Sequence, residues 1–529
     1  MREDFEKIIN YLSQLPLSVL DNAIPGVFQF LVDMDESPST PDLAKAIVTI
    51  KGSSIFEDRE IRDSVFEIEQ LPKINTWARN RQCSDALQKL GLSENFLPTQ
   101  RKTRKVFFDL LPESKLHDYQ DWMKRKVSSF ILSDRSVPEK LMVQMPTGSG
   151  KTWTMMESIY DFLRINKNPN SGVVWMAHTD ELCEQAVESF KRGWPNRGTS
   201  DVEVLRLWGG NVSRLRNIPD SAFFAVTSFQ SAFSMINTRK DDVFHLFSEI
   251  KKRNSLLIVD EAHQAKAPTY ETSINFIKPY QTSVIGLSAT PGRDGIDGDG
   301  LETKELSELF DNNLFTIDEF CKDTGKTPIR YLQDKKILST LSYSQLKTDY
   351  SIELNESELI SFKETLQLPE SFLRRVGEDT GRNTLIIAHI IKLVEEQRKK
   401  PLVFASSKDN SDRLASLLVL RGISAKSVTS ETSFTDRQKA VQDFKSGVLD
   451  VLLNYGVFTT GFDDPTIDCI MIARPTTSIV LYSQMIGRGL RGPLNGGTEN
   501  CLVVDIIDNI DRQPDIDLAN NYFQDYWKK

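Results

Sequence analysis

The sequence has 529 residues, a length at which chains usually divide, so we expect about three or four domains. Its composition, with 39% hydrophobic and 26% charged residues, excludes a compositionally extreme protein, and no apolar run is long enough to span a membrane. The formal net charge of −9 excludes little, because proteins that hold nucleic acids use local channels rather than the balance of the whole chain.

The cysteines and the start of the chain predict a cytoplasmic protein. Five cysteines lie far apart and form no Cys-x-x-Cys pair, namely Cys83, Cys183, Cys321, Cys469 and Cys501. This spacing favours reduced thiols and argues against a structural zinc site. Residues 1–6 are acidic and amphipathic, unlike a secretory signal.

Residues 1–110 predict a helical N-terminal accessory domain. Phe5, Ile8, Ile9 and Leu12 have helical apolar spacing, and no long alternating strand pattern follows. A basic cluster at 101–105 ends this region. It can be a solvated linker or a contact to a nucleic-acid backbone, and the sequence leaves both interpretations open.

Two series of short apolar runs predict two tandem α/β domains with parallel sheets. The first series, within 111–300, comprises 141–145, 172–176, 223–226, 256–259 and 283–287. The second series, within 396–529, comprises 401–405, 451–454, 469–472 and 501–505. Each run precedes a helix-like segment, as in βαβ units. The pattern is absent from 301–395, where we expect an insertion or hinge.

A glycine-rich turn between a predicted strand and a predicted helix indicates a nucleotide site. It consists of Pro146, Thr147, Gly148, Ser149, Gly150, Lys151 and Thr152. Backbone N–H groups of such a turn wrap a phosphate chain, and Lys151 is expected to reach the β- and γ-phosphates. The Thr152 hydroxyl is expected to bind Mg²⁺. The strict pattern has glycine at 145, where this chain has Met145.

A carboxylate pair follows the fourth apolar run of the first domain. Asp260 can hold Mg²⁺ through water, and Glu261 can orient or deprotonate an attacking water. An isolated Asp-Glu at this position is usually only a strand end that enters solvent. Its place after the phosphate loop makes the catalytic interpretation the stronger one.

The segment from Gln484 to Arg491 lies in the second α/β domain and carries two arginines, Arg488 and Arg491. Their spacing predicts that both lie on one face of a helix. An arginine that arrives from a second domain can raise phosphoryl-transfer rates by ~10³-fold or more. We therefore assign Gln484, Arg488 and Arg491, with Lys151 and Glu261, to catalysis, and expect ATP to pull the two domains together.

In this order the motifs resemble the core of a DEAH-type superfamily 2 helicase over roughly residues 112–510. The resemblance implies two RecA-like domains, ATP and Mg²⁺. It assigns Tyr119 and Gln120 to adenine, although His117 stands where the family motif often has arginine. It assigns Asp463 to the nucleotide. Coupling between hydrolysis and domain movement is assigned to His263, Ser288 and Thr290. The strand contacts that it implies are Thr179, Gly210, Ser228, Gln230, Ser406, Thr429 and Thr459.

Further details are similar to one DNA-directed branch of the superfamily, which includes excision-repair-type and bacterial radiation-resistance-type helicases and restriction-enzyme translocase subunits. These details are Phe462-Asp463, the 484–491 segment and Val503-Val504-Asp505. The resemblance implies an ATP hydrolase that acts as a DNA helicase or translocase in repair, restriction or phage defence, and it favours DNA over RNA.

Two alternatives use the same motifs. The chain can be an ATP-gated switch that recognises a nucleic acid and recruits a partner, such as a nuclease or a repair or defence factor, through residues 1–105. It can also be an RNA-directed motor. The five histidines are scattered and no nuclease cluster is recognisable, so any cleavage is expected from a partner.

Overall fold

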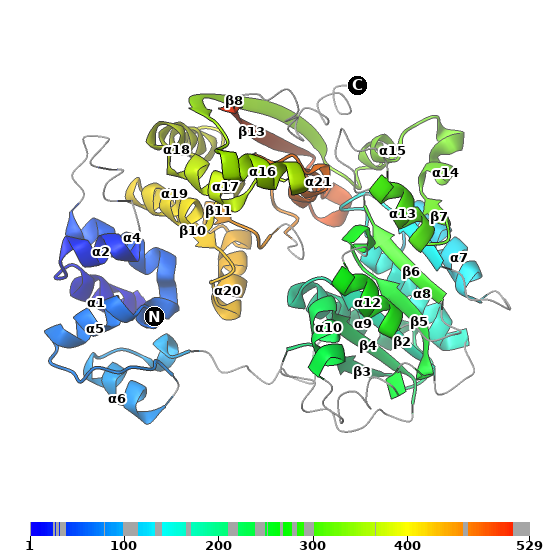
Figure 1. The fold of residues 1–529 in the computed structure, drawn as a ribbon, viewed down its shortest axis with the longest axis horizontal. Helices are drawn as coiled ribbons and strands as arrows, with labels where there is room; N and C mark the ends of the chain where they lie inside the picture. Colours follow the sequence, from blue (N-terminus) through cyan, green and yellow to red (C-terminus); the bar gives the residue numbers. More distant parts are fainter. Residues whose placement is uncertain are drawn as a thin grey trace.

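The computed structural model describes residues 2–24, 27, 31, 39–78, 80–98, 115–132, 140–165, 171–209, 221–238, 249–250, 252–264, 268–277, 283–289, 301–365, 367–458 and 464–510. In these ranges the chain forms two all-parallel sheets covered by helices and a helical N-terminal domain (Figure 1). The predicted tandem α/β fold is therefore confirmed.

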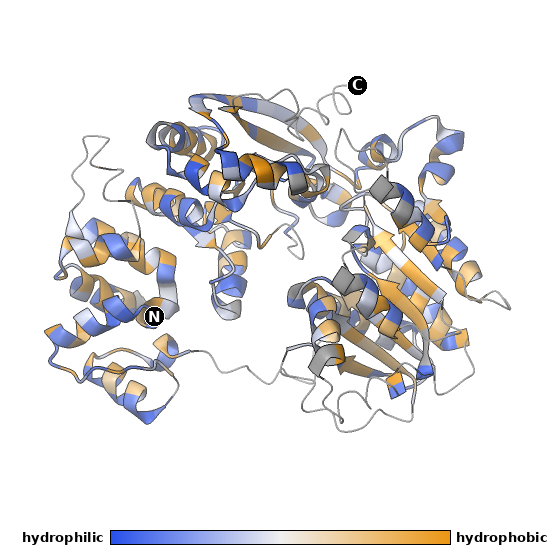
Figure 2. Ribbon diagram, in the orientation of Figure 1, coloured by the Kyte–Doolittle hydropathy of each residue, from blue (hydrophilic) through white to orange (hydrophobic). Residues whose placement is uncertain are grey.

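The first lobe is built on a seven-stranded sheet of order β3-β4-β2-β5-β6-β1-β7. Its strands are β1 (Lys140–Gln144), β2 (Gly172–Ala177), β3 (Glu203–Arg206), β4 (Phe223–Ser228), β5 (Asn254–Val259), β6 (Ser283–Ser288) and β7 (Leu314–Thr316). The strands are mostly hydrophobic (Figure 2) because helices bury both faces of a parallel sheet. Since all strands are parallel, their carboxyl ends share one edge.

Helices of the first lobe cover the two faces of this sheet. One face carries α7 (Asp118–Leu132), α8 (Lys151–Ile165) and α9 (Asp180–Arg197). The other carries α10 (Phe229–Thr238), α12 (Pro268–Ile277) and α13 (Leu301–Leu309). Two short helices, α14 (Asp318–Cys321) and α15 (Pro328–Asp334), follow β7 and pack toward α7, where Trp122 and Phe320 have ring centroids 5.8 Å apart.

The second lobe is built on a six-stranded sheet of order β10-β11-β9-β12-β13-β8. Its strands are β8 (Thr340–Ile352), β9 (Pro401–Phe404), β10 (Ala425–Val428), β11 (Val451–Asn454), β12 (Cys469–Ile472) and β13 (Asn500–Ile510). Its helices are α16 (Glu356–Thr365), α17 (Glu370–Glu378), α18 (Thr380–Glu395), α19 (Lys408–Leu420), α20 (Phe434–Lys445) and α21 (Ile479–Ile486). The apolar cluster that contains α20 and α21 continues into the first lobe.

The segment 301–395 is not a separate insertion, which corrects the prediction. Strand β7 pairs with β1 in the first sheet, and β8 pairs with β13 in the second. The connection between the lobes is short and lies near 335–339, where the Ser339 N–H donates to the Leu490 carbonyl at 2.9 Å. The prediction failed because an edge strand such as β8 has polar residues along its length and lacks the apolar run of a central strand.

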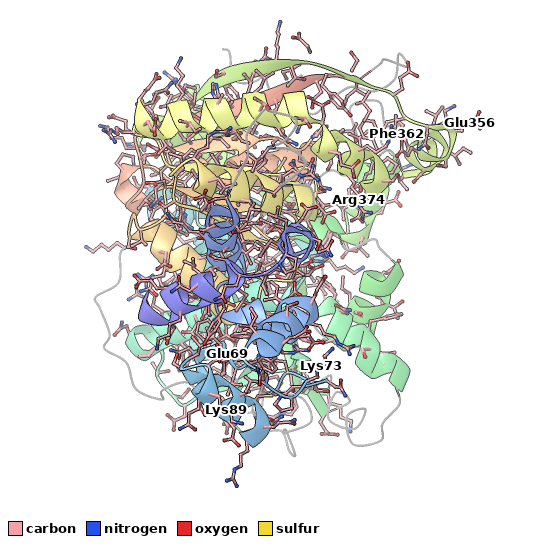
Figure 3. The ribbon with its side chains drawn as sticks, turned by 90° about the vertical axis from the view of Figure 1, so that its left-hand side faces the viewer. Glu69, Lys73, Lys89, Glu356, Phe362 and Arg374 are labelled. Atoms are coloured by element: carbon pink, nitrogen blue, oxygen red, sulfur yellow. The ribbon has the colours of Figure 1, made fainter. Side chains whose placement is uncertain are left out.

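The N-terminal domain is helical, as predicted. Its helices are α1 (Arg2–Leu12), α2 (Leu17–Ala23), α4 (Thr40–Lys51), α5 (Arg59–Ile68) and α6 (Arg81–Lys89), with short 3₁₀ turns at Gly52–Glu57 and Glu94–Phe96. Figure 3 views the molecule from the side of this domain, where Glu69, Lys73 and Lys89 are exposed.

This domain packs on the second lobe. Helices α4 and α19 are in contact, and the two parts share one apolar core. The ammonium of Lys426, at the buried strand β10, donates to the carbonyls of Thr49 (2.8 Å) and Ile50 at the end of α4. Burial lowers the pKa of Lys426 to about 8. Ser53 also donates to Asp436 of α20 at 2.7 Å. The N-terminal domain is therefore attached to the second lobe, which carries Arg488 and Arg491.

The helices of the described part of the chain are too short or too polar to cross a membrane. All five cysteines are buried and free.

Candidate active site

The phosphate loop lies at the carboxyl edge of the first sheet, between β1 and α8. Gly148 (φ 79°) and Gly150 (φ 82°) are in the left-handed region, which glycine adopts without steric cost. Met145 is fully buried and its N–H donates to the Ser288 carbonyl at 3.1 Å. Its side chain belongs to the core, so the loop itself begins at Pro146 and the absence of glycine at 145 leaves the turn intact.

Tyr119 and Gln120, at the start of α7, contact this loop directly. The Tyr119 hydroxyl and the Gln120 amide donate to the Ser149 carbonyl at 2.6 and 2.9 Å. A Cβ on Gly150 would lie only 2.4 Å from the Gln120 amide nitrogen, so the close approach requires glycine there. The structure therefore gives both residues a role in supporting the loop, and their contact with adenine stays a prediction.

The carboxylate pair follows β5, with Asp260 fixed by a 2.8 Å bond from its N–H to the Met176 carbonyl. Glu261 has φ 50°, a left-handed conformation that costs a non-glycine residue about 1–3 kcal/mol and often marks functional sites. Its N–H donates to the Asp260 carboxylate at 3.0 Å. The turn thereby brings both carboxylates to one edge of the sheet.

The charges around this pair fit a divalent cation. Burial, followed by the charge of Glu261, raises the pKa of Asp260 to about 7 despite the nearby Lys151 ammonium. A cation bound beside the two carboxylates would offset the cost of burying them and the repulsion between them. The described residues contain no cluster of three or more metal-ligating side chains, and Mg²⁺ usually takes one or two protein ligands plus phosphate and water oxygens. Thr152 and Asp260 therefore suit Mg²⁺ bound with a nucleotide.

Two histidines lie beside Glu261. His263 is buried, with its Nδ1 3.4 Å from the Glu261 carboxylate and 3.1 Å from the Ser288 hydroxyl at the end of β6. The structure thus joins two of the three predicted coupling residues, His263 and Ser288. His178, at the end of β2, interacts electrostatically with Glu261 and was not singled out from the sequence. The sequence could have identified His178 from its position at a strand end, directly before Thr179.

The second lobe reaches this site through the arginine segment, here defined as residues 473–491. Burial alone would raise the pKa of Glu261, but Lys151, His263 and Arg488 together lower it below its ordinary value. A Cβ on Gly487 would lie 2.1 Å from the Thr147 methyl group. The two lobes therefore touch at the phosphate loop, and glycine at 487 permits this approach.

The two arginines do not share a helix face, which corrects the prediction. Helix α21 ends at Ile486, and Gly487–Gly489 forms a 3₁₀ turn that carries Arg488. Arg491 lies beyond the turn, where its carbonyl accepts from the Ser339 hydroxyl at 2.6 Å. The amide nitrogen of Gln484 is buried and has no hydrogen-bond partner in the described part of the chain. Arg488 is among the groups that lower the pKa of Glu261.

Several predicted strand contacts lie at the carboxyl edges of the sheets but serve as local caps. The Thr179 hydroxyl accepts from the Leu182 N–H at 3.3 Å, at the start of α9. Ser228 accepts from the Ser231 N–H at 3.2 Å, and Thr429 accepts from the Glu431 N–H at 3.3 Å. Gln230 is exposed in the first turn of α10. The placement at these edges agrees with the prediction, whereas contact with a strand is untested.

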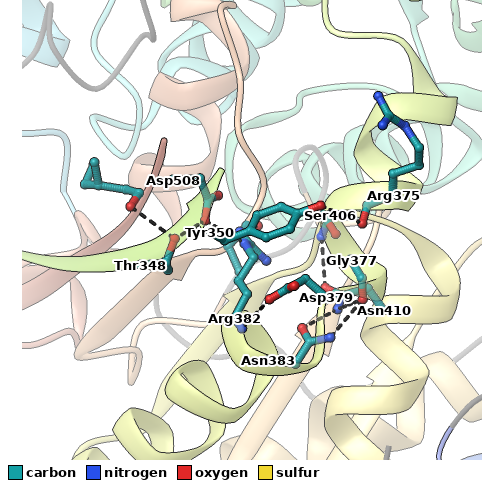
Figure 4. A network of polar contacts seen from close by, with 12 residues as sticks. Thr348, Tyr350, Arg375, Gly377, Asp379, Arg382, Asn383, Ser406, Asn410 and Asp508 are labelled. Atoms are coloured by element: carbon teal, nitrogen blue, oxygen red, sulfur yellow. Dashed lines mark hydrogen bonds and ion pairs between the residues drawn. The ribbon is translucent and has the colours of Figure 1, made fainter. Parts of the chain in front are cut away.

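Ser406 does not fit the predicted contact with a strand. Its side chain is 0% exposed and lies beneath α17, as Figure 4 shows. A Cβ on Gly377 would lie 2.6 Å from the Ser406 hydroxyl. Asn383 and Asn410 both donate to the Gly377 carbonyl, at 2.9 and 3.0 Å. This network holds α17 over Ser406, so its hydroxyl cannot reach a phosphate in this arrangement.

Substitution of Ser406 tests this correction. Ser406→Ala is expected to leave strand affinity within about twofold and the free energy of unfolding within about 1 kcal/mol, because the hydroxyl has no partner among the described residues. Fluorescence anisotropy with a labelled strand and urea unfolding measure the two quantities. Gly377→Ala, by contrast, should destabilise by about 1–3 kcal/mol through overpacking. A large loss of affinity in Ser406→Ala would restore the original assignment.

Some predicted residues lie outside the described ranges. These are Gly210, Thr290, Thr459 and Asp463, together with the basic cluster at 101–105.

Two parallel-sheet lobes thus bring a phosphate loop, a carboxylate pair and an arginine together where the lobes meet, which defines a two-lobed P-loop nucleotide hydrolase. The model of the type III restriction enzyme res subunit matches residues 113–293, and that of the helicase conserved C-terminal domain matches residues 385–492. The chain belongs to the superfamily 2 helicases and translocases, in the branch with restriction-enzyme translocase subunits.

Known proteins similar to this chain include two from yeasts. IRC3 of Saccharomyces cerevisiae, described as an ATP-dependent helicase, is 29% identical over 73% of this chain and 51% of its own length. The irc3 protein of Schizosaccharomyces pombe, described as a mitochondrial ATP-dependent helicase, is 28% identical over 70% of this chain and 54% of its own length. The chain spans about half the length of these relatives.

Among solved structures, the ATP-dependent type ISP restriction-modification enzyme LlaBIII bound to DNA shares the fold. It has a TM-score of 0.50 at 15% identity, covering 79% of this chain and 29% of that one.

Proposed function

We propose that this chain is an ATP-driven motor that moves along DNA as a helicase or translocase. The observation that carries the proposal is the close approach of Gly487, in the second lobe, to Thr147 of the phosphate loop, which brings the neighbouring Arg488 within electrostatic reach of Glu261. Since a complete hydrolytic site then requires both lobes, hydrolysis and lobe movement are linked. That linkage is what a motor needs to convert ATP turnover into steps along a strand.

The side chains where the two lobes meet each have a role in ATP binding or hydrolysis. Lys151 and the backbone of 146–150 bind the phosphates, and Thr152 and Asp260 hold Mg²⁺. Glu261 orients or deprotonates the attacking water. Arg488 stabilises the charge of the transition state, with Gln484 beside it. The low pKa of Glu261 means that its carboxylate is ionised, so it can accept a hydrogen bond from the attacking water and orient it.

Coupling to the strand runs through the edge of the first sheet. His263 contacts both Glu261 and Ser288, so a change at the γ-phosphate reaches the end of β6. His178, next to Glu261, directly precedes Thr179 at the start of α9. Thr179 and the exposed Gln230 are well placed for contact with a sugar-phosphate backbone, which needs hydroxyl, amide and backbone donors rather than base recognition.

DNA is the favoured track. The first-lobe match to a restriction-enzyme subunit supports it, and LlaBIII, the related fold described above, is bound to DNA. A setting in repair, restriction or phage defence follows from the same likeness. Free, buried cysteines support a reducing compartment such as the cytoplasm. The N-terminal domain, attached to the second lobe, is the part available to a nuclease or another repair or defence factor.

The deciding experiment compares ATP hydrolysis without nucleic acid and with single-stranded DNA, duplex DNA, forked DNA or RNA. We expect stimulation by DNA that exceeds stimulation by RNA, and no turnover in Lys151→Ala under any condition. Stimulation by RNA alone would establish an RNA-directed motor instead. The absence of ATP hydrolysis with every nucleic acid would contradict the proposed function.

A second assay separates a motor from a recognition switch. Displacement of a labelled strand, and of a triplex-forming strand on duplex DNA, report unwinding and duplex translocation respectively. ATP hydrolysis with neither displacement would support the switch, in which ATP times the release of a bound partner.

A further inference from the structure

Strand β13 holds the arginine segment through two carboxylates. Asp505 lies in the middle of this strand and Asp508 near its carboxyl end, and both are buried. Asp505 is the acidic residue of the Val-Val-Asp sequence, to which none of the nucleotide-binding roles above applies. Its carboxylate is shielded from solvent and lies near the hydroxyl groups of Tyr482 in α21 and Tyr343 in β8.

Asp508 fixes the beginning of the segment. Its carboxylate accepts from Arg382 at 2.9 Å and from the Thr348 hydroxyl at 2.7 Å. The same Arg382 donates to the Ala473 carbonyl at 2.7 Å, and Figure 4 shows it pointing from α18 toward Asp508. Since Arg382 is fully buried, the bond holds the chain where it leaves β12 for α21.

Asp505 fixes the helix itself. Its carboxylate accepts from the Tyr482 hydroxyl of α21 at 2.7 Å. Tyr482 is buried and lies one and a half turns before Arg488. With the beginning of the segment already held, this bond sets the rotation of α21 about its axis. The rotation in turn decides where the 3₁₀ turn at Gly487–Gly489 presents Arg488.

We propose that Asp505 and Tyr482 are positioning residues for Arg488, an inference that rests on the proposed function. Neither residue is placed at the nucleotide. Their bond aligns Arg488 with the phosphates that the first lobe holds. A displacement of about 1 Å at a reacting centre costs about 10²-fold in rate, so a small rotation of α21 is enough to lower turnover.

Tyr482→Phe tests the bond with almost no change in volume. We expect kcat for ATP hydrolysis to fall at least about tenfold, whereas KM for ATP is unchanged because the first lobe binds the nucleotide. Asp505→Asn keeps an acceptor for the Tyr482 hydroxyl and should retain most of the rate, whereas Asp505→Leu should lose it. The matched control is Tyr343→Phe, which removes another hydroxyl near Asp505 but leaves α21 untouched.

Two further variants separate positioning from stability. In Tyr482→Phe/Asp505→Leu both buried polar groups are gone, so the melting temperature should recover while kcat stays low. In an Arg488→Ala background, Tyr482→Phe should have no further effect on kcat if it acts only through Arg488. A wild-type rate in Tyr482→Phe, or full additivity with Arg488→Ala, would overturn the inference. Failure of the wild-type protein to hydrolyse ATP would overturn the proposed function instead.

Discussion

Glu261→Gln is expected to lower ATP hydrolysis by about 10²–10⁴-fold while ATP binding persists. The amide can no longer accept a proton from the attacking water, but it keeps the size of the carboxylate. Burial and then the charge of Glu261 raise the pKa of Asp260, and the substitution removes the second of these two causes. Asp260 then ionises more readily and can still hold Mg²⁺. Rapid-quench hydrolysis and equilibrium binding of labelled ATP measure the two effects separately.

Lys151→Ala is the contrasting control. It removes the cation of the phosphate loop, so it should lose both nucleotide affinity and turnover. Both variants should keep the melting temperature of the wild-type protein within a few degrees, since each side chain is partly exposed in the cleft. If Glu261→Gln hydrolyses ATP at the normal rate, Glu261 is not the catalytic carboxylate and Asp260 becomes the candidate.

Arg488→Ala should reduce kcat by about 10³-fold and leave ATP affinity within a few-fold. The loop and the carboxylates that bind ATP belong to the first lobe, whereas Arg488 arrives from the second and acts on Glu261. Its loss therefore affects the transition state more than the bound substrate. Steady-state hydrolysis at saturating nucleic acid gives kcat, and a fluorescent ATP analogue gives the affinity.

Arg491→Ala provides the comparison. Its backbone is held by the lobe connection through Ser339, and it lies beyond the 3₁₀ turn that carries Arg488. We expect a much smaller loss than for Arg488→Ala. The reverse order would transfer the arginine-finger role to Arg491 and would mean that the lobes rotate further on ATP binding.

The central strands and the nucleotide site could be predicted because their signals are local in the sequence. Strands such as β2 and β4 are buried on both faces, so each appears as an unbroken apolar run. The loop 146–152 carries its phosphate-binding geometry within seven consecutive residues. Asp260 and Glu261 follow directly from the end of β5, since strand ends in a parallel sheet lie at a common edge.

Edge strands were missed for the opposite reason. In β8, exposed and partly buried residues alternate, and its polar sequence resembles a loop. Strand β3 has only one fully buried residue, Leu205. The spacing of Arg488 and Arg491 likewise predicted a continuous helix, although Gly487 and Gly489 end it. Gly487 and Gly489 are needed because they lie close to the side chains of Thr147 and Cys501, neither of which adjoins them in the sequence.

By itself the sequence determined the two α/β lobes, the phosphate loop and the carboxylate pair, because apolar runs and contiguous turns encode them directly. The tertiary structure alone decided that Arg488 lies on a 3₁₀ turn and lowers the pKa of Glu261, that α17 buries Ser406, and that the N-terminal domain joins the second lobe. These outcomes depend on packing between segments that are tens to hundreds of residues apart, where the burial of apolar surface and the pairing of buried charges select one arrangement.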